Sequence, residues 1–311
     1  MAKIKTNGTT GTVVSATKRK HTADDESSDD GAELINVDFE WFDPQEIDFH
    51  GLKLLLRQLF DADNQLFDLS ELVNLILSQP LLGSTVKCPS DDDSILTKET
   101  DPFAFLTVLN MHTHRANKAI QSLIAYLIKK AQSITSLSTL PTLLDPNNPA
   151  QVGLILSERF INMPNEIVPP MYRMLLEEIQ WANEENEPYT FSHYLILSKT
   201  YTEIASKLDS MVDTEAAQPP SKKTKKSQKA AGGSSVKAET FYFHAEDEVF
   251  QRHAVGFGDF AYERQREEGA SDAKRAFEEV GIEPVGHMVL IEAAAFEKAV
   301  GAVNEYFGQA A

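Results

Sequence analysis

Two kinds of apolar segment alternate along this chain, and their alternation restricts the possible folds more than any other feature of the sequence. Continuous apolar runs such as Phe103–Met111 are typical of buried strands. Other segments repeat apolar residues every three or four positions, as at Ile120, Leu123 and Leu127, and this spacing predicts amphipathic helices. Strands that alternate with helices favour an α/β fold with a mixed β-sheet flanked by helices, rather than a bundle or a sandwich.

The same patterns predict the individual elements. We expect strands at 36–42, 82–88, 103–111, 189–201, 240–244 and 287–291, and one that begins at 152. We expect helices capped by Asp48, after Ser70, around 120–128, behind Pro169-Pro170, and around 271–280 and 293–307. No internal repeat is visible, so the elements are expected to form one unit.

Two segments lack the apolar residues that a core requires. Residues 1–33 are rich in Ser, Thr and Gly without apolar periodicity, which predicts a disordered N-terminal tail. Residues 214–239 are rich in Lys, Pro, Gly and Ser. Since lengthening a flexible loop costs only about 0.6 kcal/mol per doubling, neighbouring strands can tolerate such an insert. We therefore predict a single α/β domain over 34–311, interrupted by a disordered lysine-rich loop at about 214–239.

The negative charge of the chain is concentrated outside these two segments. The formal net charge is -18, but residues 31–213 and 241–311 together hold 18 basic and 40 acidic residues, a charge of -22. Such a body repels phosphate backbones and attracts basic proteins, so no direct nucleic-acid partner is expected. The alternative interpretation is that the acidic excess only maintains solubility.

Two acidic runs and one methionine are candidate partner-binding residues. The acidic runs would contribute charge, and methionine is common on adaptable binding surfaces. The first run could also bind a cation, but the ligand spacing of a Ca²⁺ loop is missing. The candidates are Asp91, Asp92, Asp93, Glu246, Asp247, Glu248 and Met163.

Cysteine and histidine give no strong indication of a catalytic or metal site. The single cysteine, Cys88, cannot form an internal disulfide, in agreement with a reducing compartment, and nothing local would lower its pKa. His112 and His114 could share a metal ion, but no third ligand is identifiable. We interpret the two histidines as hydrogen-bonding residues at a sheet edge and expect no metal site.

The sequence Gly256-Phe257-Gly258 is the one glycine-rich signal. It can be compared with the phosphate-binding turn of N-acetyltransferases, but the register of the basic residues differs. Asp259 would also lie unfavourably close to bound phosphates. We therefore predict a turn or bulge, no cofactor, and no enzymatic activity.

A lysine cluster suggests where the protein acts. Lys222, Lys223, Lys225 and Lys226 lie in the predicted loop at the density that nuclear import receptors recognise, although a solvated linker is the competing interpretation. The chain has no run of 18 apolar residues and its N-terminus is polar, so neither membrane insertion nor secretion is expected. The predicted location is the nucleus, with shuttling to the cytoplasm.

An unusual connection follows the strand that begins at 152. The polar residues 157–159 interrupt this otherwise apolar strand, residues 162–164 turn the chain, and Pro169-Pro170 restricts the geometry of the residues before it. The connection is therefore expected to be rigid. It could form an edge next to a binding surface, or it could serve the fold alone.

These strings resemble the BCCIP family, whose fungal members are called Bcp. The resemblance rests on 155–164, 168–176, 36–40, 241–244 and 246–248, and it extends over roughly 34–311. The motif residues are Ser157, Glu158, Arg159, Asn162, Pro164, Pro169 and Pro170. The resemblance implies a mainly nuclear protein whose fold is similar to that of the N-acetyltransferases without their cofactor site.

The resemblance also implies a function. Fungal members are associated with chaperoning one basic protein of the large ribosomal subunit, with ribosome biogenesis and with nuclear export of a phosphoinositide kinase. We therefore expect a nuclear escort whose partners are a basic ribosomal protein, an import receptor and a phosphoinositide kinase. The alternatives are an adaptor in cell-cycle control or DNA repair, which would bind short peptides, and an acyltransferase that uses the Gly256-Phe257-Gly258 turn.

Overall fold

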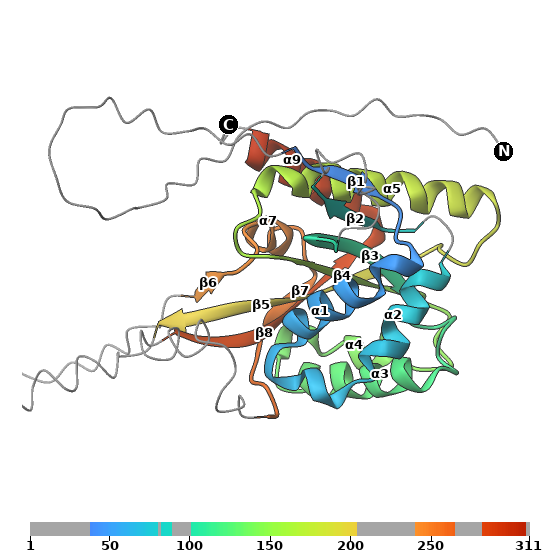
Figure 1. The fold of residues 1–311 in the computed structure, drawn as a ribbon. Helices are drawn as coiled ribbons and strands as arrows, with labels where there is room; N and C mark the ends of the chain where they lie inside the picture. Colours follow the sequence, from blue (N-terminus) through green and yellow to red (C-terminus); the bar gives the residue numbers. More distant parts are fainter. Residues whose placement is uncertain (1–37, 80–81, 89–100, 204–239, 265–281, 309–311) are drawn as a thin grey trace, which may run out of the picture.

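The protein folds as an eight-stranded, mostly antiparallel sheet between two layers of helices, over the residues that the computed structural model describes (Figure 1). These residues are 38–79, 82–88, 101–203, 240–264 and 282–308. The strands are β1 (Glu40–Phe42), β2 (Ser84–Lys87), β3 (Ala104–Asn110), β4 (Val152–Arg159), β5 (His193–Glu203), β6 (Thr240–Tyr242), β7 (Gly256–Phe260) and β8 (Ile282–Glu292). Their order in the sheet is β1-β2-β3-β4-β5-β8-β7, and β6 pairs with β5.

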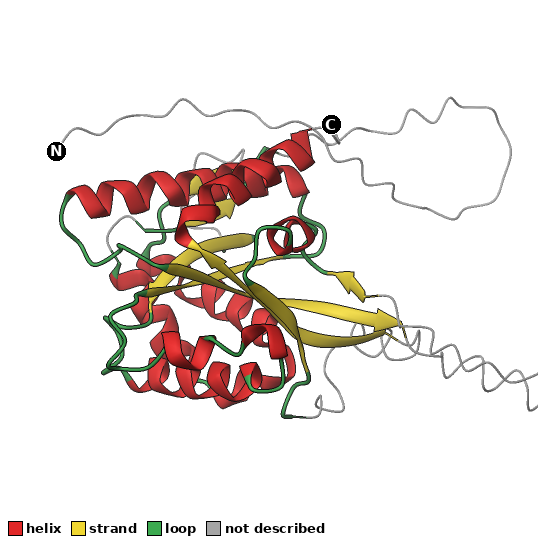
Figure 2. Cartoon of the chain, turned by 180° about the vertical axis from the view of Figure 1, so that it is seen from behind, coloured by secondary structure: helices red, strands yellow, loops and turns green. Residues whose placement is uncertain are grey.

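The helices divide between the two faces of the sheet (Figure 2). One face is covered by α1 (Phe49–Phe60), α2 (Leu69–Ser78), α3 (Lys118–Ala131) and α4 (Leu140–Leu143). The other face is covered by α5 (Val168–Glu184), α7 (Glu246–Gln251) and α9 (Ala293–Gly308). Short 3-10 helices are η1 (Glu46–Asp48), η2 (Asp61–Leu66), η4 (Thr135–Leu137) and η5 (Asn165–Ile167). No described helix has the length and apolar character needed to span a bilayer.

Successive side chains of a strand point to opposite faces of the sheet, and this produces two apolar cores, one on each face. In β4, Leu154 and Leu156 join the cluster that α1 to α4 cover, whereas Ile155 joins the cluster beneath α5, α7 and α9. This is the two-residue period of a strand buried on both sides. All three side chains are inaccessible to solvent, and each such burial contributes about 1.5–3 kcal/mol.

The one parallel strand pair of the described sheet, β4 and β5, diverges halfway along its length. The two strands pair from Val152 opposite His193 to Leu156 opposite Leu197. Beyond that point, β4 stays paired with β3 through Arg159, while β5 acquires β6 as its neighbour at residues 200–202. Side chains, rather than backbone hydrogen bonds, must therefore fill the space between the two strand ends.

Most of the predicted elements are confirmed where the structure describes them. Two predictions about β4 and α1 are corrected. Residues 157–159 do not interrupt the strand but continue it, since each pairs with β3. Asp48 precedes α1 as expected, yet its side chain does not cap that helix. It forms a buried ion pair of 2.5 Å with Lys87 instead and accepts a hydrogen bond from the Gln45 amide.

The glycines of Gly256-Phe257-Gly258 lie in strand β7, not in the turn or bulge that we predicted. A Cβ on Gly256 would lie 2.1 Å from the carbonyl oxygen of Ser136, and one on Gly258 would lie 2.6 Å from Ile134 Cγ2. The glycines therefore allow the 134–137 segment to approach the strand closely. Helix α7 was not predicted, and the helix expected around 271–280 lies outside the described residues.

Candidate functional site

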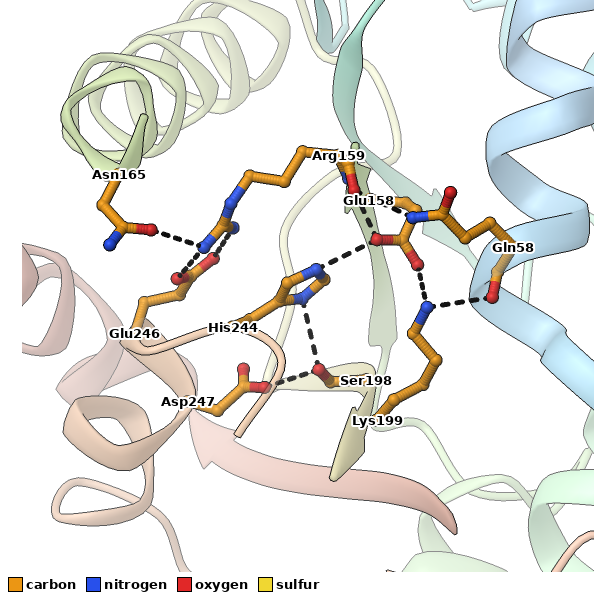
Figure 3. Close-up of polar contacts among 9 residues, drawn as sticks. All are labelled: Gln58, Glu158, Arg159, Asn165, Ser198, Lys199, His244, Glu246 and Asp247. Carbon is orange, nitrogen blue, oxygen red and sulfur yellow. Dashed lines mark hydrogen bonds and ion pairs between the residues drawn. The ribbon is translucent and has the colours of Figure 1, made fainter. Parts of the chain in front are cut away.

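Ionisable side chains fill the space where β4 and β5 diverge (Figure 3). They come from the last residues of β4, the middle of β5, the β6–α7 connection and the first turn of α7. Every one of these side chains is buried. We call them the divergence network, which consists of Glu158, Arg159, Ser198, Lys199, His244, Glu246 and Asp247.

Glu158 lies at the centre of the network on the face covered by α1. Its carboxylate contacts Lys199 Nζ at 2.6 Å and His244 Nε2 at 3.0 Å. Burial raises the pKa of Glu158, but the Lys199 and His244 charges and hydrogen bonds outweigh burial and lower the pKa to about 2. Lys199 Nζ also donates to the carbonyl oxygen of Gln58 at 2.9 Å, so one carboxylate links β4, β5 and α1.

Arg159 lies on the opposite face and joins β4 to α7 and η5. Its two terminal nitrogens donate to the two oxygens of Glu246, at 2.5 and 2.9 Å, in a bidentate pair. It also donates to Asn165 Oδ1 at 3.1 Å. Burial lowers the pKa of Arg159 and Glu246 raises it, so that the net shift is upward.

His244 connects the two faces of the sheet. One ring nitrogen contacts Glu158, and the other lies 3.3 Å from Ser198 Oγ, which donates to Asp247 at 2.5 Å. Burial raises the pKa of Asp247 to about 6, against the lowering effect of the His244 charge. The imidazole therefore lies between the diverging strands and links a side chain of β4 to a side chain of β5.

The network joins elements that are far apart in sequence, and its polar groups bind one another. Lys199 and Arg159 balance the two carboxylates whose pKa is lowered, Glu158 and Glu246. Among the described residues, those of the network included, no group of three or more His, Cys, Asp or Glu is arranged to hold a metal ion. As it stands, the network fixes the position of β4, β5 and α7 relative to one another.

The residues of the family motif lie in the network and in the connection from β4 to α5. Glu158 and Arg159 belong to the network, Pro164 precedes η5, and Pro169 and Pro170 occupy the first turn of α5. Asn162 is exposed in the connection at 160–164, where the Met163 amide donates to the Phe160 carbonyl in a turn. Ser157 is half-buried on β4.

The expected placement of the second acidic run is corrected. Glu246 and Asp247 are each 1% exposed, because the first turn of α7 packs them against Arg159 and Ser198. In this structure they cannot present charge to a partner. Glu248 is exposed and forms an i,i+4 ion pair with Arg252 at 2.7 Å.

The remaining candidates are distributed over the molecule. Met163 is half-buried and packs against the core beneath α5. His112 lies in the turn after β3, where its Nδ1 accepts from the Val152 amide at 3.4 Å. Burial lowers the pKa of His112 and of His114, and raises that of the Cys88 thiol. The lysines at 222–226 and the aspartates at 91–93 lie outside the described residues.

Sequence reasoning did not single out three of the seven network residues, Ser198, Lys199 and His244. A lysine within an apolar strand, Lys199, was an available signal, because a buried amine requires a carboxylate partner. Ser198 and His244 gave no comparable signal. Their role depends on the point at which β4 and β5 separate, and that point is determined by tertiary structure.

Comparisons with known proteins agree with the resemblance. The BCCIP family model matches residues 34–250. "Protein bcp1" of Emericella nidulans is 54% identical over 281 residues, which cover 90% of this chain and 91% of that protein. "Protein bcp1" of Schizosaccharomyces pombe is 47% identical over 277 residues, covering 88% and 91%.

A solved structure supports the fold. The crystal structure of BCP1 from Saccharomyces cerevisiae matches with a TM-score of 0.55 and 24% identity, and covers 90% of this chain and 92% of that chain. At that identity the likeness concerns the mixed α/β architecture alone. The family model and the fungal relatives lead to one conclusion: the chain belongs to the BCCIP family.

Proposed function

We propose that the protein is a non-enzymatic nuclear escort, which keeps a basic protein of the large ribosomal subunit soluble and thereby supports ribosome biogenesis. The observation that carries this proposal is the acidic excess of residues 31–213 and 241–311, which hold 40 acidic against 18 basic residues. A ribosomal protein carries the opposite charge because it binds RNA.

Buried ion pairs leave this acidic excess on the exterior. Lys87, Lys130, Arg159 and Lys199 are buried, and each of them pairs with a carboxylate inside the molecule. Each pair withdraws one charge of each sign from the surface, so the net charge that a partner meets stays acidic. Opposite charge would accelerate the capture of a basic cargo, and ribosomal RNA would compete for the cargo at the site of release.

A non-enzymatic role is also supported by β7. Its two glycines allow close packing against 134–137, so they need no phosphate ligand to explain them. We further propose that the sheet is related to that of the N-acetyltransferases, as the family resemblance implies. If no cofactor binds, acetyl-CoA will leave the melting temperature unchanged, whereas a rise would favour an acyltransferase.

The test of the escort role is mass spectrometry of the proteins that co-purify with the tagged full chain from its own cells, at moderate and at high salt. A single basic ribosomal protein in near-equal amount that survives high salt supports the proposal. A broad basic mixture that disappears with salt contradicts it, because exposed charge pairs alone are screened. Recovery of cell-cycle or repair proteins would favour the adaptor role, and a phosphoinositide kinase would favour a role in its export.

A separate experiment tests nuclear import. We propose that an import receptor recognises the lysines at 222, 223, 225 and 226, because a dense run of positive charge matches an acidic receptor groove. Replacing the four lysines by glutamine in the full chain should move the protein from the nucleus to the cytoplasm. Unchanged nuclear localisation would refute that assignment.

A further inference from the structure

Trp181 is an unusual surface residue. It lies near the C-terminal end of α5 and is 56% exposed, although tryptophan normally buries most of its area. Exposed indole rings are common where proteins bind partners. The ring is therefore a candidate contact for another molecule.

Every neighbour of Trp181 on the helix surface is acidic. Residues three and four positions away lie beside a given residue on a helix, and for Trp181 these are Glu177, Glu178, Glu184 and Glu185. Glu177, Glu184 and Glu185 are exposed. Within the described part of the chain, none of these three forms an ion pair, and the only basic residue of α5, Arg173, lies about two turns away.

A second segment places negative charge close to Glu178. Burial raises the pKa of Glu178 to about 7, against a hydrogen bond from the Gly83 amide, and the charges of Asp43 and Glu177 raise it further. Asp43 precedes η1 and is exposed, so its charge acts on the residue one turn before Trp181 on α5.

We infer that Trp181, Glu177, Glu184 and Glu185 form a docking surface for an arginine-rich segment of the basic cargo. A guanidinium group can stack on the indole face while its nitrogens donate to the carboxylates around it. Arginine fits better than lysine, because its planar fork uses both contacts together. The assignment of the partner rests on the proposed function, whereas the chemistry of the surface does not.

The full chain with Trp41→Phe provides a direct assay, because Trp181 is then its only tryptophan. Titration with an arginine nonapeptide at physiological salt should quench the Trp181 emission saturably, and a lysine nonapeptide should bind more weakly. The triple substitution E177Q/E184Q/E185Q should weaken arginine binding by about tenfold or more. The matched control E283Q/E297Q/E305Q makes the same change of charge on β8 and α9 and should weaken it much less.

The cargo recovered from cells gives a second readout. Trp181→Ala should lower the affinity for that cargo by about tenfold, whereas Tyr306→Ala, which removes an exposed aromatic ring from α9, should not. The inference would be overturned if E177Q/E184Q/E185Q and E283Q/E297Q/E305Q weakened arginine-peptide binding equally. It would also be overturned if the peptide caused no saturable quenching of Trp181. Quenching that appears only after Lys222, Lys223, Lys225 and Lys226 are replaced by glutamine would also overturn it, because the chain's own loop would then be the occupant.

The docking surface around Trp181 and the escort role can each be refuted without refuting the other. If the cargo binds with unchanged affinity to Trp181→Ala, the docking surface is wrong and the escort role stands. If no ribosomal protein co-purifies but the arginine peptide still quenches Trp181, the surface is right and the escort role is wrong.

Discussion

Removing Arg159 tests whether the divergence network holds the fold together. The variant Arg159→Met loses the bidentate pair with Glu246 and the hydrogen bond to Asn165. The Glu246 carboxylate, which is 1% exposed, then keeps its charge without the Arg159 partner. Breaking one side of a buried ion pair costs about 3–5 kcal/mol. We expect a loss of that size in the free energy of unfolding at neutral pH.

The assay is urea unfolding of the full chain, followed by far-UV circular dichroism. The double variant Arg159→Met, Glu246→Leu should recover most of the loss, because two apolar side chains replace the buried pair without an orphaned charge. Arg252→Met is the control, since it breaks the exposed pair with Glu248 and should change stability by less than about 1 kcal/mol.

The pH dependence gives an independent check. Burial raises the pKa of Glu246, and in the wild type Arg159 outweighs burial and lowers it. Without Arg159, the folded-state pKa should rise above the unfolded value. Protonation then favours the folded state, so the defect of Arg159→Met should be smaller at pH 5 than at pH 8. A loss below about 1 kcal/mol, or strictly additive single and double variants, would refute the reasoning.

Three further predictions concern the same fold. Gly256→Ala should lower the melting temperature and reduce the free energy of unfolding by about 1–3 kcal/mol, because its Cβ would meet a backbone oxygen at 2.1 Å. Gly301→Ala on α9, which has open space around it, should raise the free energy of unfolding by up to about 1 kcal/mol. Asp247 has a pKa raised to about 6, so its ionisation should lower the stability of the wild type as pH rises from 4 through 6. Asp247→Asn should remove that contribution in thermal unfolding and leave the one from Glu178, whose pKa is raised to about 7. Asp63 accepts both the Glu263 and Arg264 amides, so Asp63→Ala should accelerate tryptic cleavage at Arg264, and unchanged cleavage would contradict this anchoring role.

The fold class and most elements could be predicted from the sequence, because their apolar periods are strong. The seven-residue strand β3 and the face of α1 that contains Leu52 and Leu59 are examples. The pairing of strands could not be predicted in the same way. Nothing in the apolar run of β4 shows that it pairs with β5 only as far as Leu156, since that limit depends on β6 and on the buried groups beside it.

The candidate site shows the same division between local and tertiary information. Glu158 and Arg159 stand out in the sequence as polar residues that were predicted to interrupt an apolar strand, and the structure keeps them in that strand and gives both of them partners. The run at 246–248 appears in the sequence as a uniformly acidic surface. Two of its members face the core, because the helical period turns Glu246 and Asp247 inward and leaves Glu248 outside.

Buried and surface charges are expected to control two different properties of the proposed escort, its stability and its affinity for cargo. Charges inside the molecule are paired, so changing them should alter stability and leave cargo affinity largely unaffected. Glu177, Glu184 and Glu185 around Trp181 form no ion pair within the described part of the chain, and Glu184 accepts one hydrogen bond from Gln180, so changing them should alter affinity and leave stability within about 0.5 kcal/mol. Each buried pair removes one positive and one negative charge, so the contacts that make the scaffold rigid leave the acidic excess to the surface, where a cargo would meet it.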